Sequence, residues 1–587
     1  MSSTATETIE LHALAVATDV GPGKGLHSIA DDSPRLIVGA GERSRRSTDE
    51  SVYVDGTHPG QGNGKSLLRI SLAIGQPSLV NFAVSFTNGI ITVALPAISR
   101  SINLPRELFL WPSSVYGLTS GAALLLAGSI ADLVGAKSVE LVGVGILAIF
   151  ALASGLAQTG QQLVAFRALM GIGMVGESLI FSPLCPPVRV LIDECNLHLQ
   201  AMHLPSSVSL VAAAVPRGRA RNVGFAFLGL TQPLGFSLGL ILAGVLLQSS
   251  DEGWRKAFFT SGSLTAIAAM GGYWVLPSVE AAATGSSIWS KLKAEVDWVG
   301  VGLSSAGLSL FAYVLAMLSA DLSVIRTGTT ATLLALSLML IVSFPFWMSY
   351  RTRHGKVALI PNSLWQNIPF TSICLLVTLS WGALNSIELF SSLYFQEIQH
   401  HTSLTTSLLL LPMILVGTLA NFSTGVFVDR LPARWLIAIS SLLTAGTPLI
   451  MALVDPNLNY WYLQFWAQVL APLSADILFT VGLIVVSESF PEQTQALAGA
   501  VFNTVAQLGL SLGMGVCQVV ALGVSATGGG AGHGGSGSQD AGIQTDVASL
   551  LRGYRASFWT IFGYMIICTA VAVVGLRNVG KVGVKRD

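Results

Sequence analysis

Charged residues are scarce in this chain. Asp, Glu, Lys and Arg make up only 11% of the sequence, compared with about 25% in an ordinary soluble domain. Apolar residues make up 52%, which is more than a water-soluble fold needs for its core. The 31 basic residues are balanced by 31 acidic ones, so the excess positive charge of a nucleic-acid-binding protein is absent. The composition therefore predicts a protein embedded in a lipid bilayer, with no nucleic acid as a partner.

Cysteines are also few, and they are scattered along the sequence. The five do not form a CxxC pair and have no histidine at a metal-ligand spacing, so we expect neither a disulfide framework nor a metal site. HExxH and Walker motifs are missing, and no aspartates pair within an apolar segment. We therefore expect no enzyme and no cofactor. Residues 1–70 lack the early apolar core of a secretory signal and are polar, which predicts a disordered cytoplasmic tail.

Long apolar windows follow this tail. A hydrocarbon core about 30 Å thick needs about 20 apolar residues per helix. Windows of that kind predict fourteen spans in an all-α membrane protein. They lie near residues 77–98, 110–131, 139–157, 161–215 (interrupted), 223–248, 257–276, 296–318, 329–349, 369–391, 404–428, 433–454, 461–487, 496–522 and 558–576.

The basic residues are distributed unevenly between the two sides that fourteen spans create. With the N-terminus inside, 22 of the 31 Lys and Arg residues fall on the cytoplasmic side and seven on the other. This asymmetry predicts that both chain ends are cytoplasmic. The Gly-rich stretch 524–549 then becomes an external loop before the last span, and residues 578–587 become a second cytoplasmic tail.

Two patterns recur along the chain and indicate a duplication. The first relates two loops at an offset of 297 residues, and it matches Gly128, Asp132, Ala136 and Lys137 with Gly425, Asp429, Ala433 and Arg434. The second has an offset of 275 residues and matches Gly224, Phe227 and Gln232 with Gly499, Phe502 and Gln507. We therefore expect a six-helix bundle at 71–276, two linking spans at 277–368 and a second six-helix bundle at 369–577.

The difference between the two offsets means that the first half holds 22 extra residues. The source is residues 175–200 in the fourth span, which contain three prolines and the acids Glu177, Asp193 and Glu194. A helix with these residues is not expected in lipid. Deleting this stretch restores one continuous apolar span, so our hypothesis is a translated, unspliced intron. The alternative is a genuine re-entrant insertion, whose irregular backbone would have to be buried in protein or line a cavity.

The loop motif, which begins Gly128-Ser-Ile-Ala-Asp132, resembles a signature of the major facilitator superfamily. Over about residues 75–577 the chain resembles that superfamily's fourteen-span drug:proton antiporter group, in its aminotriazole-resistance-like fungal branch. The resemblance implies that the paired loops latch neighbouring helices as two halves rock against each other. The residues of this expected latch are Gly128, Asp132, Gly135, Lys137, Asp429, Arg430 and Arg434.

Two further motifs carry the same resemblance. Arg167, with Gly171 and Gly173 behind it, resembles the membrane arginine linked to proton transfer, although snorkelling to the interface is an alternative. The fifth span resembles the antiporter motif, in which small residues and a proline shape a close helix contact. Its residues are Gly229, Gln232, Pro233, Gly235 and Gly239.

Asp476 is the acid nearest the middle of any predicted span. Desolvation at that depth favours the protonated carboxylic acid, so proton binding there could be coupled to transport. The alternative is a structural hydrogen bond to a neighbouring helix. Polar and aromatic residues of the later spans could line a central cavity, namely Trp381, Asn385, Asn503 and Gln507. Glu388 is near a span end, and we expect it at a solvated interface.

The resemblance implies export of small molecules in exchange for protons, by alternating access at the interface of the two halves, from the plasma membrane. An uptake carrier or facilitator for a small polar solute such as ammonium or borate is the nearest alternative. An inactive product, caused by residues 175–200, is a third. The duplication argues against a receptor. Substrate identity and oligomeric state are not readable from the sequence.

Overall fold

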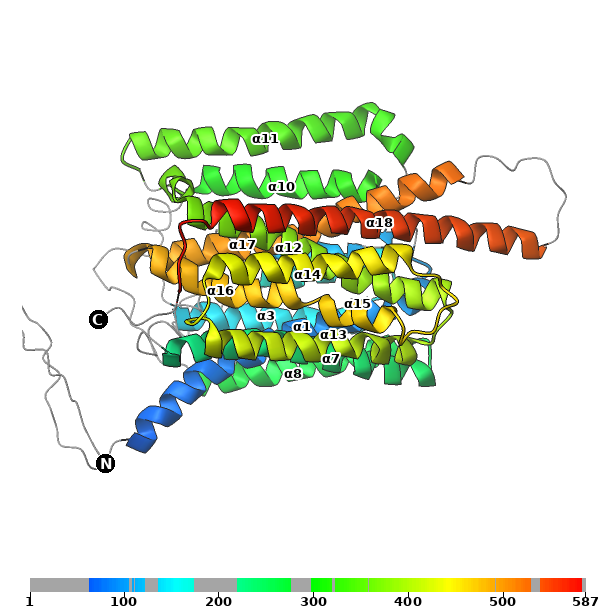
Figure 1. Cartoon of the computed structure of the whole chain (residues 1–587), viewed down its shortest axis with the longest axis horizontal. Helices are drawn as coiled ribbons and strands as arrows, with labels where there is room; N and C mark the ends of the chain where they lie inside the picture. The colour runs from blue at the N-terminus through cyan, green and yellow to red at the C-terminus, as the bar shows by residue number, and fades with distance from the viewer. Residues whose placement is uncertain are drawn as a thin grey trace, which may run out of the picture. The chain divides into compact units, whose positions relative to one another are not determined.

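The computed structural model of the chain is a bundle of helices that run roughly parallel or antiparallel to one another (Figure 1). It describes residues 63–104, 108–109, 111–121, 136–173, 219–275, 297–318, 322–356, 358–490, 492–528 and 539–582. The predicted all-α fold is confirmed for these residues. Segment 174–218, which includes the anomalous stretch 175–200, lies outside them, as do Gly128, Asp132 and Gly135.

The N-terminal helices form one group. It contains α1 (Asn63–Ser101), the helical segment 111–121, α3 (Ala136–Leu156), α4 (Gly160–Gly173), α7 (Arg219–Ser249) and α8 (Gly253–Val275). Within the group α1 packs against α7 and α8, and α3 packs against α4 and α8. We call the end of the bundle at which α1 and α7 end the distal end, and the opposite end the proximal end.

The C-terminal helices form a second group. It contains α12 (Ile368–Leu393), α13 (Ser403–Phe427), α14 (Ala433–Leu453), α15 (Gln464–Leu470), α16 (Leu473–Ser489), α17 (Glu492–Gly528) and α18 (Gln539–Gly575). Side-chain caps set some of the boundaries: Asn367 accepts from the amide of Phe370 at the start of α12, and Thr402 accepts from the amide of Thr405 at the start of α13. A π-helical turn, η4 (Tyr394–Ile398), follows α12 at the distal end.

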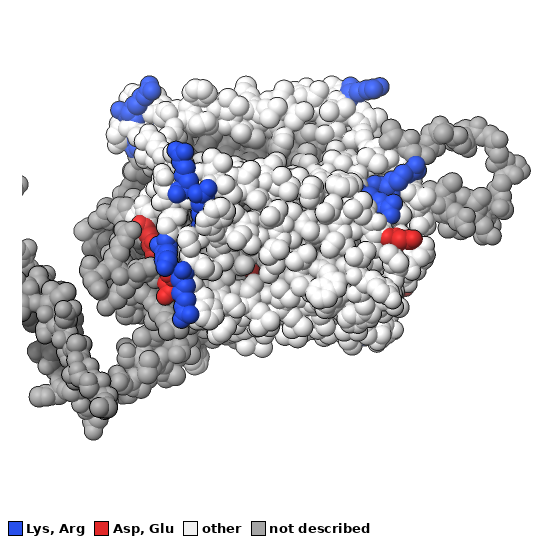
Figure 2. Space-filling model, viewed as in Figure 1, with Lys and Arg blue, Asp and Glu red and all other residues white. Residues whose placement is uncertain are grey.

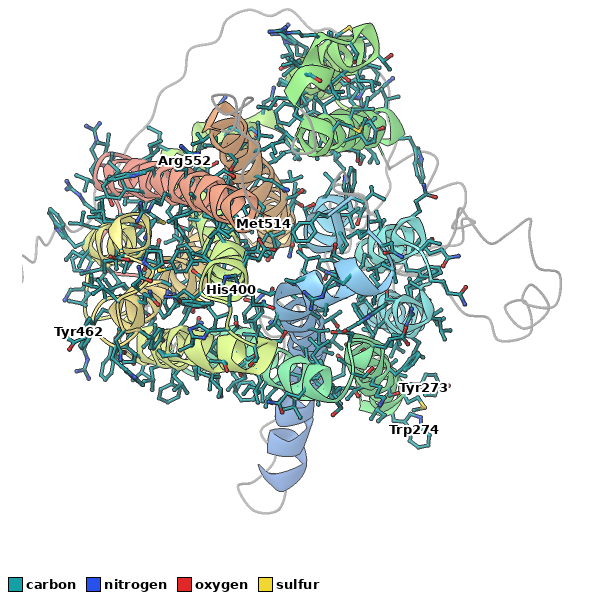
Figure 3. The ribbon with its side chains drawn as sticks, turned by 90° about the vertical axis from the view of Figure 1, so that its right-hand side faces the viewer. Tyr273, Trp274, His400, Tyr462, Met514 and Arg552 are labelled. Atoms are coloured by element: carbon teal, nitrogen blue, oxygen red, sulfur yellow. The ribbon has the colours of Figure 1, made fainter. Side chains whose placement is uncertain are left out.

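Two helices stand apart from both groups. α10 (Trp298–Leu318) and α11 (Gly328–Arg353) pair with each other, and α10 also contacts α17. Figure 3, which looks along the helices, shows this pair at the edge of the bundle, with the two groups side by side beneath it. Buried Asp297 fastens the pair, because it accepts from the indole of Trp347 (3.0 Å) and forms an ion pair with Arg351 (3.7 Å). The link between the halves is therefore a helical hairpin.

The surface between the two ends is apolar. In the described part of the chain, ten helical stretches are long and apolar enough to cross a membrane. Figure 2 shows an almost uncharged belt on the visible face, with Lys and Arg side chains gathered toward its two ends. Because apolar side chains cover this belt, the chain is an integral multi-pass membrane protein.

The structure corrects several predicted boundaries. Residues 63–70, expected to belong to the disordered tail, are the first turns of α1, which extends beyond the apolar window. The last helix, α18, begins at Gln539 rather than near 558, and α17 continues to Gly528. The described parts of the expected loop 524–549 are therefore helical, because helix formation does not stop where hydropathy falls. The span expected at 461–487 corresponds to one apolar stretch, Gln464–Ser489, which consists of two helices, α15 and α16, separated at Ala471 and Pro472.

Candidate functional site

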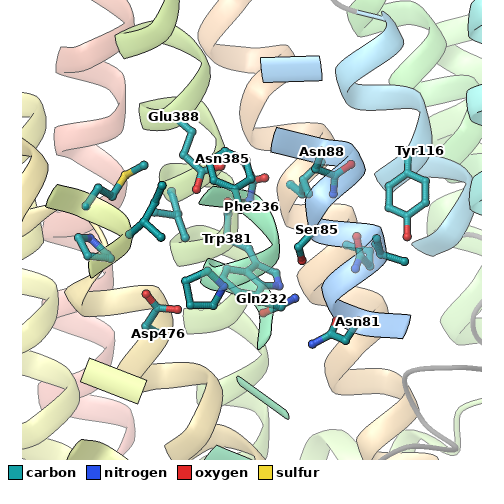
Figure 4. Close-up of a pocket in the computed structure, with 18 residues that line it drawn as sticks. Asn81, Ser85, Asn88, Tyr116, Gln232, Phe236, Trp381, Asn385, Glu388 and Asp476 are labelled. Atoms are coloured by element: carbon teal, nitrogen blue, oxygen red, sulfur yellow. Dashed lines mark hydrogen bonds between the residues drawn. The ribbon is translucent and has the colours of Figure 1, made fainter. Parts of the chain in front are cut away.

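A cavity lies between the two groups of helices and takes its lining from both. It encloses about 880 Å³ of space between atoms, part of it open to solvent. Figure 4 shows α1 side chains on one side of the cavity and Asp476, Trp381 and Glu388 on the other. The lining residues are Asn81, Val84, Ser85, Asn88, Tyr116, Gln232, Pro233, Phe236, Trp381, Leu384, Asn385, Glu388, Met413, Ile414, Pro472, Asp476, Gln507 and Leu510. Apolar walls with a few convergent polar groups are typical of small-molecule sites.

The first half contributes a polar stripe from α1. Asn81, Ser85 and Asn88 are four and three residues apart, and this spacing places them on one face of the helix. The amide of Asn81 also donates to Thr231 on α7 (3.4 Å). This stripe is not among the residues predicted from the sequence, although polar residues at helical spacing within an apolar span were the signal that could have revealed it.

The second half contributes Trp381, Asn385 and Glu388 from one face of α12. The Trp381 ring stacks on Phe479 with the ring centroids 5.7 Å apart, and the Asn385 amide donates to the carbonyl of Trp381 (2.9 Å). Glu388 lies in the cavity wall and not at the solvated interface that its sequence position suggested. A residue close to the end of a span can still face inward, because the helix face decides its direction.

Asp476 lies in the first turn of α16 and is 6% exposed. The amide of Asn421 on α13 donates to Asp476 Oδ1 (2.7 Å), and the hydroxyl of Thr480 donates to Asn421 Oδ1 (3.1 Å). A hydrogen bond to a neighbouring helix is thus present, and the carboxyl group lines the cavity as well. The α13 backbone approaches it closely at Gly417, where a Cβ atom would come 2.3 Å from Asp476 Oδ2.

Arg167 lies on α4 beside a smaller cavity of about 370 Å³, which shares Asn88, Tyr116, Asn385 and Glu388 with the larger one. Arg167 Nε donates to the carbonyl of Pro112 (2.9 Å), and Nη2 donates to Asn88 Oδ1 (3.0 Å). The side chain is 1% exposed, so the alternative that it snorkels to the interface is wrong. Its Nη1 has no hydrogen-bond partner among the described residues. The guanidinium of Arg167 and the carboxyl group of Glu388 therefore line one space between the halves.

The remaining predicted polar residues do not all line the cavity. Gln232 on α7 and Gln507 on α17, which the sequence repeat pairs, both line the cavity from opposite halves. Asn503 does not line it: it is 2% exposed, and its amide donates to the carbonyl of Gly499 in the preceding turn (2.9 Å). In the described part of the chain, no group of three His, Cys, Asp or Glu side chains is placed to hold a metal ion.

The glycines of the fifth-span motif mark a very close helix contact. A Cβ at Gly235 would lie 2.2 Å from the carbonyl oxygen of Phe82 on α1, and one at Gly239 would lie 2.0 Å from that of Phe86. The second half repeats this contact between α17 and α12, where a Cβ at Gly509 would lie 2.2 Å from the carbonyl oxygen of Thr378. Pro233 lines the cavity, and the surroundings of Gly229 lie outside the described side chains.

We expect Gly239→Ala to destabilise the protein, because the new methyl group would push α7 away from α1. Overpacking of this kind costs about 1–3 kcal/mol. Gly145→Ala on α3 is the matched control, because nothing lies within 4 Å of a Cβ there. The control should be neutral or stabilising by up to about 1 kcal/mol. Thermal unfolding of the purified protein in detergent measures both variants, and equal unfolding temperatures would contradict the close contact.

The second loop of the expected latch is described in part. Asp429 is exposed, the Arg430 guanidinium lies over the Phe427 ring (5.0 Å), and that of Arg434 lies over the Trp435 ring (4.9 Å). Among the described residues no ion pair joins Asp429 to either arginine. Lys137 lies in α3, with a side chain outside the described set. The latch therefore stays a prediction.

The two halves are joined at the distal end of the cavity. Between described residues, Ser392 Oγ donates to the carbonyl of Thr92 (2.9 Å), and Gln396 Nε2 donates to that of Val93 (3.3 Å). On the neighbouring helix pair, Ser407 Oγ donates to the carbonyl of Leu240 (2.8 Å). These bonds connect α12 to α1 and α13 to α7, so they hold the halves together beyond the cavity.

Comparison with known proteins agrees with this arrangement. The chain is 37% identical to "MFS-type transporter 1" of Pyricularia oryzae over 89% of its length and 86% of that protein. It is 23% identical to "Efflux pump terJ" of Aspergillus terreus (91% and 92% covered) and 24% identical to the "Low affinity ammonium transporter" of Saccharomyces cerevisiae (77% and 78%). The crystal structure of the human organic anion transporter MFSD10 shares its fold, with a TM-score of 0.53 at 14% identity, over 86% of this chain and 99% of that one.

The family model that matches this chain covers most of the bundle. Its two matched stretches are residues 78–181 and 199–514. The gap between them, 182–198, falls inside the anomalous segment 175–200. With relatives, fold and a cavity shared by two related halves in agreement, the chain belongs to the Major Facilitator Superfamily.

Proposed function

We propose that this transporter exports small molecules in exchange for protons, and that Asp476 is the group that binds the proton. The observation that carries the proposal is the position of the Asp476 carboxyl, which is buried from bulk solvent yet lines the cavity between the halves. An ionisable group at that depth is expensive unless it has a function. Its hydrogen bond from Asn421 holds it at the wall of the cavity.

Proton binding at Asp476 would change what the cavity prefers to hold. The ionised carboxylate attracts a cationic or hydrogen-bond-donating substrate, whereas the protonated acid does not. Arg167 and Glu388 line the smaller cavity next to it, and we propose that they interact across the interface as the halves move. Trp381 and Phe236 supply apolar contact area for the substrate.

The orientation is part of the same proposal. The excess of Lys and Arg on one side supports a fourteen-span protein with both chain ends in the cytoplasm. α3, α4, α8 and the segment 111–121 would complete the count beyond the ten long apolar stretches. The distal end is then the external end, and its bonds at Thr92, Val93 and Leu240 close the cavity on that side. Alternating access requires these bonds to break when the substrate leaves.

The export direction is supported by the relative named as an efflux pump. The second candidate is uptake of a small cation such as ammonium. It is favoured by one observation in the cavity, the presence of two acidic side chains, and by the relative named as an ammonium transporter. Both candidates use the same site and differ in the direction of net flux.

Dissipating the proton gradient distinguishes the two candidates. Yeast cells that express the chain are loaded with labelled aminotriazole or labelled methylammonium, and a protonophore is then added. If the protein is an exporter, the cells should retain more labelled compound after the gradient collapses. In a one-to-one exchange with protons, the retained amount can rise by up to about tenfold for each pH unit of gradient. An uptake carrier driven by the gradient should retain less. Cells with an empty vector are the control, and label retention that matches the control with both compounds would contradict both candidates for these probes.

A further inference from the structure

Two glutamines of α15 are fully buried without a hydrogen-bond partner. Gln464 and Gln468 are both 0% exposed. Neither side-chain oxygen and neither side-chain nitrogen has a partner in the described part of the chain. Each amide can donate two hydrogen bonds and accept two. Buried groups of this kind are satisfied in native proteins by protein or by internal water, so these two need a partner that the neighbouring side chains do not supply.

The two glutamines precede the proposed proton site in the α15–α16 span. Gln464, Gln468, Pro472 and Asp476 follow one another at intervals of four residues, so each lies about one helical turn further along the α15–α16 span. Pro472 has no N–H, so it cannot donate to the carbonyl of Gln468 four residues earlier. The break in the helix thus leaves a further acceptor beside the Gln468 amide.

The neighbouring helix α13 adds a polar group at the same level. α13 and α15 both begin at the distal end, and they contact each other. Gly417 of α13 is level with Pro472 and Asp476, because a Cβ there would lie 3.2 Å from the Cβ of Pro472. Because both helices start at the distal end, equal numbers of residues cover similar distances along the bundle. Thr406 precedes Gly417 by eleven residues and Gln464 precedes Asp476 by twelve, so Thr406 and Gln464 lie at about the same height along the bundle axis. Thr406 is also 0% exposed, and its hydroxyl has no partner among the described residues.

The other side of α15 has its polar groups satisfied. Thr447 of α14 donates to the carbonyl of Ala467 (2.7 Å), and Thr444 donates to that of Leu470 (3.0 Å). These contacts between α14 and α15 are made without the amides of Gln464 and Gln468. At the distal end stands Tyr460, whose hydroxyl donates to the carbonyl of Leu409 (2.6 Å) and whose pKa is raised by burial, so that it remains a donor.

We propose that Thr406, Gln464 and Gln468 bind a file of internal water molecules between α13 and α15, and that this file carries protons from the distal end to Asp476. The proposal rests on the proposed function, because it takes Asp476 as the proton acceptor. Apolar residues that are fully buried, such as Leu410 and Ala467, confine the file to a narrow path. Three polar groups in succession give each water molecule the two to four partners that buried water requires.

A comparison within the chain supports the choice of this position. Gln464 follows Arg167 by 297 residues, the offset that relates the two loop motifs. In the first half this position carries a side chain that bonds two neighbouring segments, at Pro112 and Asn88. In the second half the same position carries a neutral amide with no such bonds. It is therefore free to bind water.

The test follows the protonation of Asp476 and needs no substrate. The purified protein in lipid is subjected to a pH jump, and the infrared band of the protonated carboxyl group is followed in time. Asp476→Asn assigns the band. Gln464→Met and Gln468→Met keep the side-chain length and remove the polar atoms, and each should slow the rise of the band at least about tenfold. Thr447→Val, which removes a satisfied hydroxyl facing the same helix, is the matched control and should leave the rate unchanged.

Two outcomes would overturn the water file while leaving Asp476 as the proton site. One is a wild-type rate in the double variant Gln464→Met/Gln468→Met. The other is a clear rise of its unfolding temperature with the rate unchanged, which would show that the amides had been dry and unsatisfied. A different result would overturn Asp476 as the proton site, and the water route with it. In that case the wild-type protein shows no carboxyl band that disappears in the Asp476→Asn variant.

Discussion

Asp476→Asn is expected to weaken proton-driven export strongly while substrate exchange continues. Asparagine keeps the shape of the side chain and its hydrogen bond with Asn421 after an amide rotation, but it cannot gain or lose a proton. Coupling free energies between two ligands are typically about 1–3 kcal/mol, so gradient-driven transport should fall about 5- to 150-fold. Exchange of labelled for unlabelled substrate needs no net proton movement and should remain near the wild-type rate.

The measurement uses efflux of labelled aminotriazole from energised cells, with exchange measured at equal pH on the two sides. Asp251→Asn is the matched control, because its side chain is 75% exposed at the distal end, and it should behave as the wild type. Asp476→Glu restores an acid at the same place and should recover part of the coupling. Full gradient-driven export by the asparagine variant would remove Asp476 from the proposed mechanism.

The second large effect is expected from deleting residues 175–200. This stretch lies outside the described residues, and the argument for deletion rests on the sequence and on the family match, which skips 182–198. An acid costs about 2.5–3.5 kcal/mol at the centre of a membrane helix, and this stretch contains three acids. The shortened chain has one continuous apolar segment at this position. It should therefore reach the membrane in several-fold larger amounts.

Two forms of the chain with the same fluorescent tag provide the test, through membrane fluorescence and aminotriazole efflux. Removing 26 residues from the polar tail, for example 10–35, controls for the deletion itself. Sequencing of the mature transcripts shows whether the codons for 175–200 are normally retained. Equal abundance and equal transport by the two forms, together with retention in most transcripts, would establish the stretch as a genuine insertion.

Much of the fold could be predicted because lipid imposes a simple rule on the sequence. Each long apolar window from residue 223 onward became helical, with the window 461–487 divided into α15 and α16, and the predicted starts of α7, α11, α12, α13 and α14 agree with the structure to within four residues. Gln507 faces the cavity, and so does its repeat partner Gln232, which the sequence predicts at a close helix contact and not in the cavity. Hydropathy could not locate the ends of α17 and α18, because both helices continue past the apolar window.

The sequence by itself determined the membrane class, the repeated halves and the presence of an acid within an apolar span, because these depend on composition and spacing alone. Only the tertiary structure decided which side chains share a space. It placed Glu388 in the cavity wall, turned Asn503 toward its own helix, bonded Arg167 to Pro112 and Asn88, and broke the twelfth predicted segment, 461–487, beside two glutamines that are unpartnered among the described residues. The physical reason is that an apolar window specifies a helix, whereas its rotation and its neighbours are set by packing against other helices.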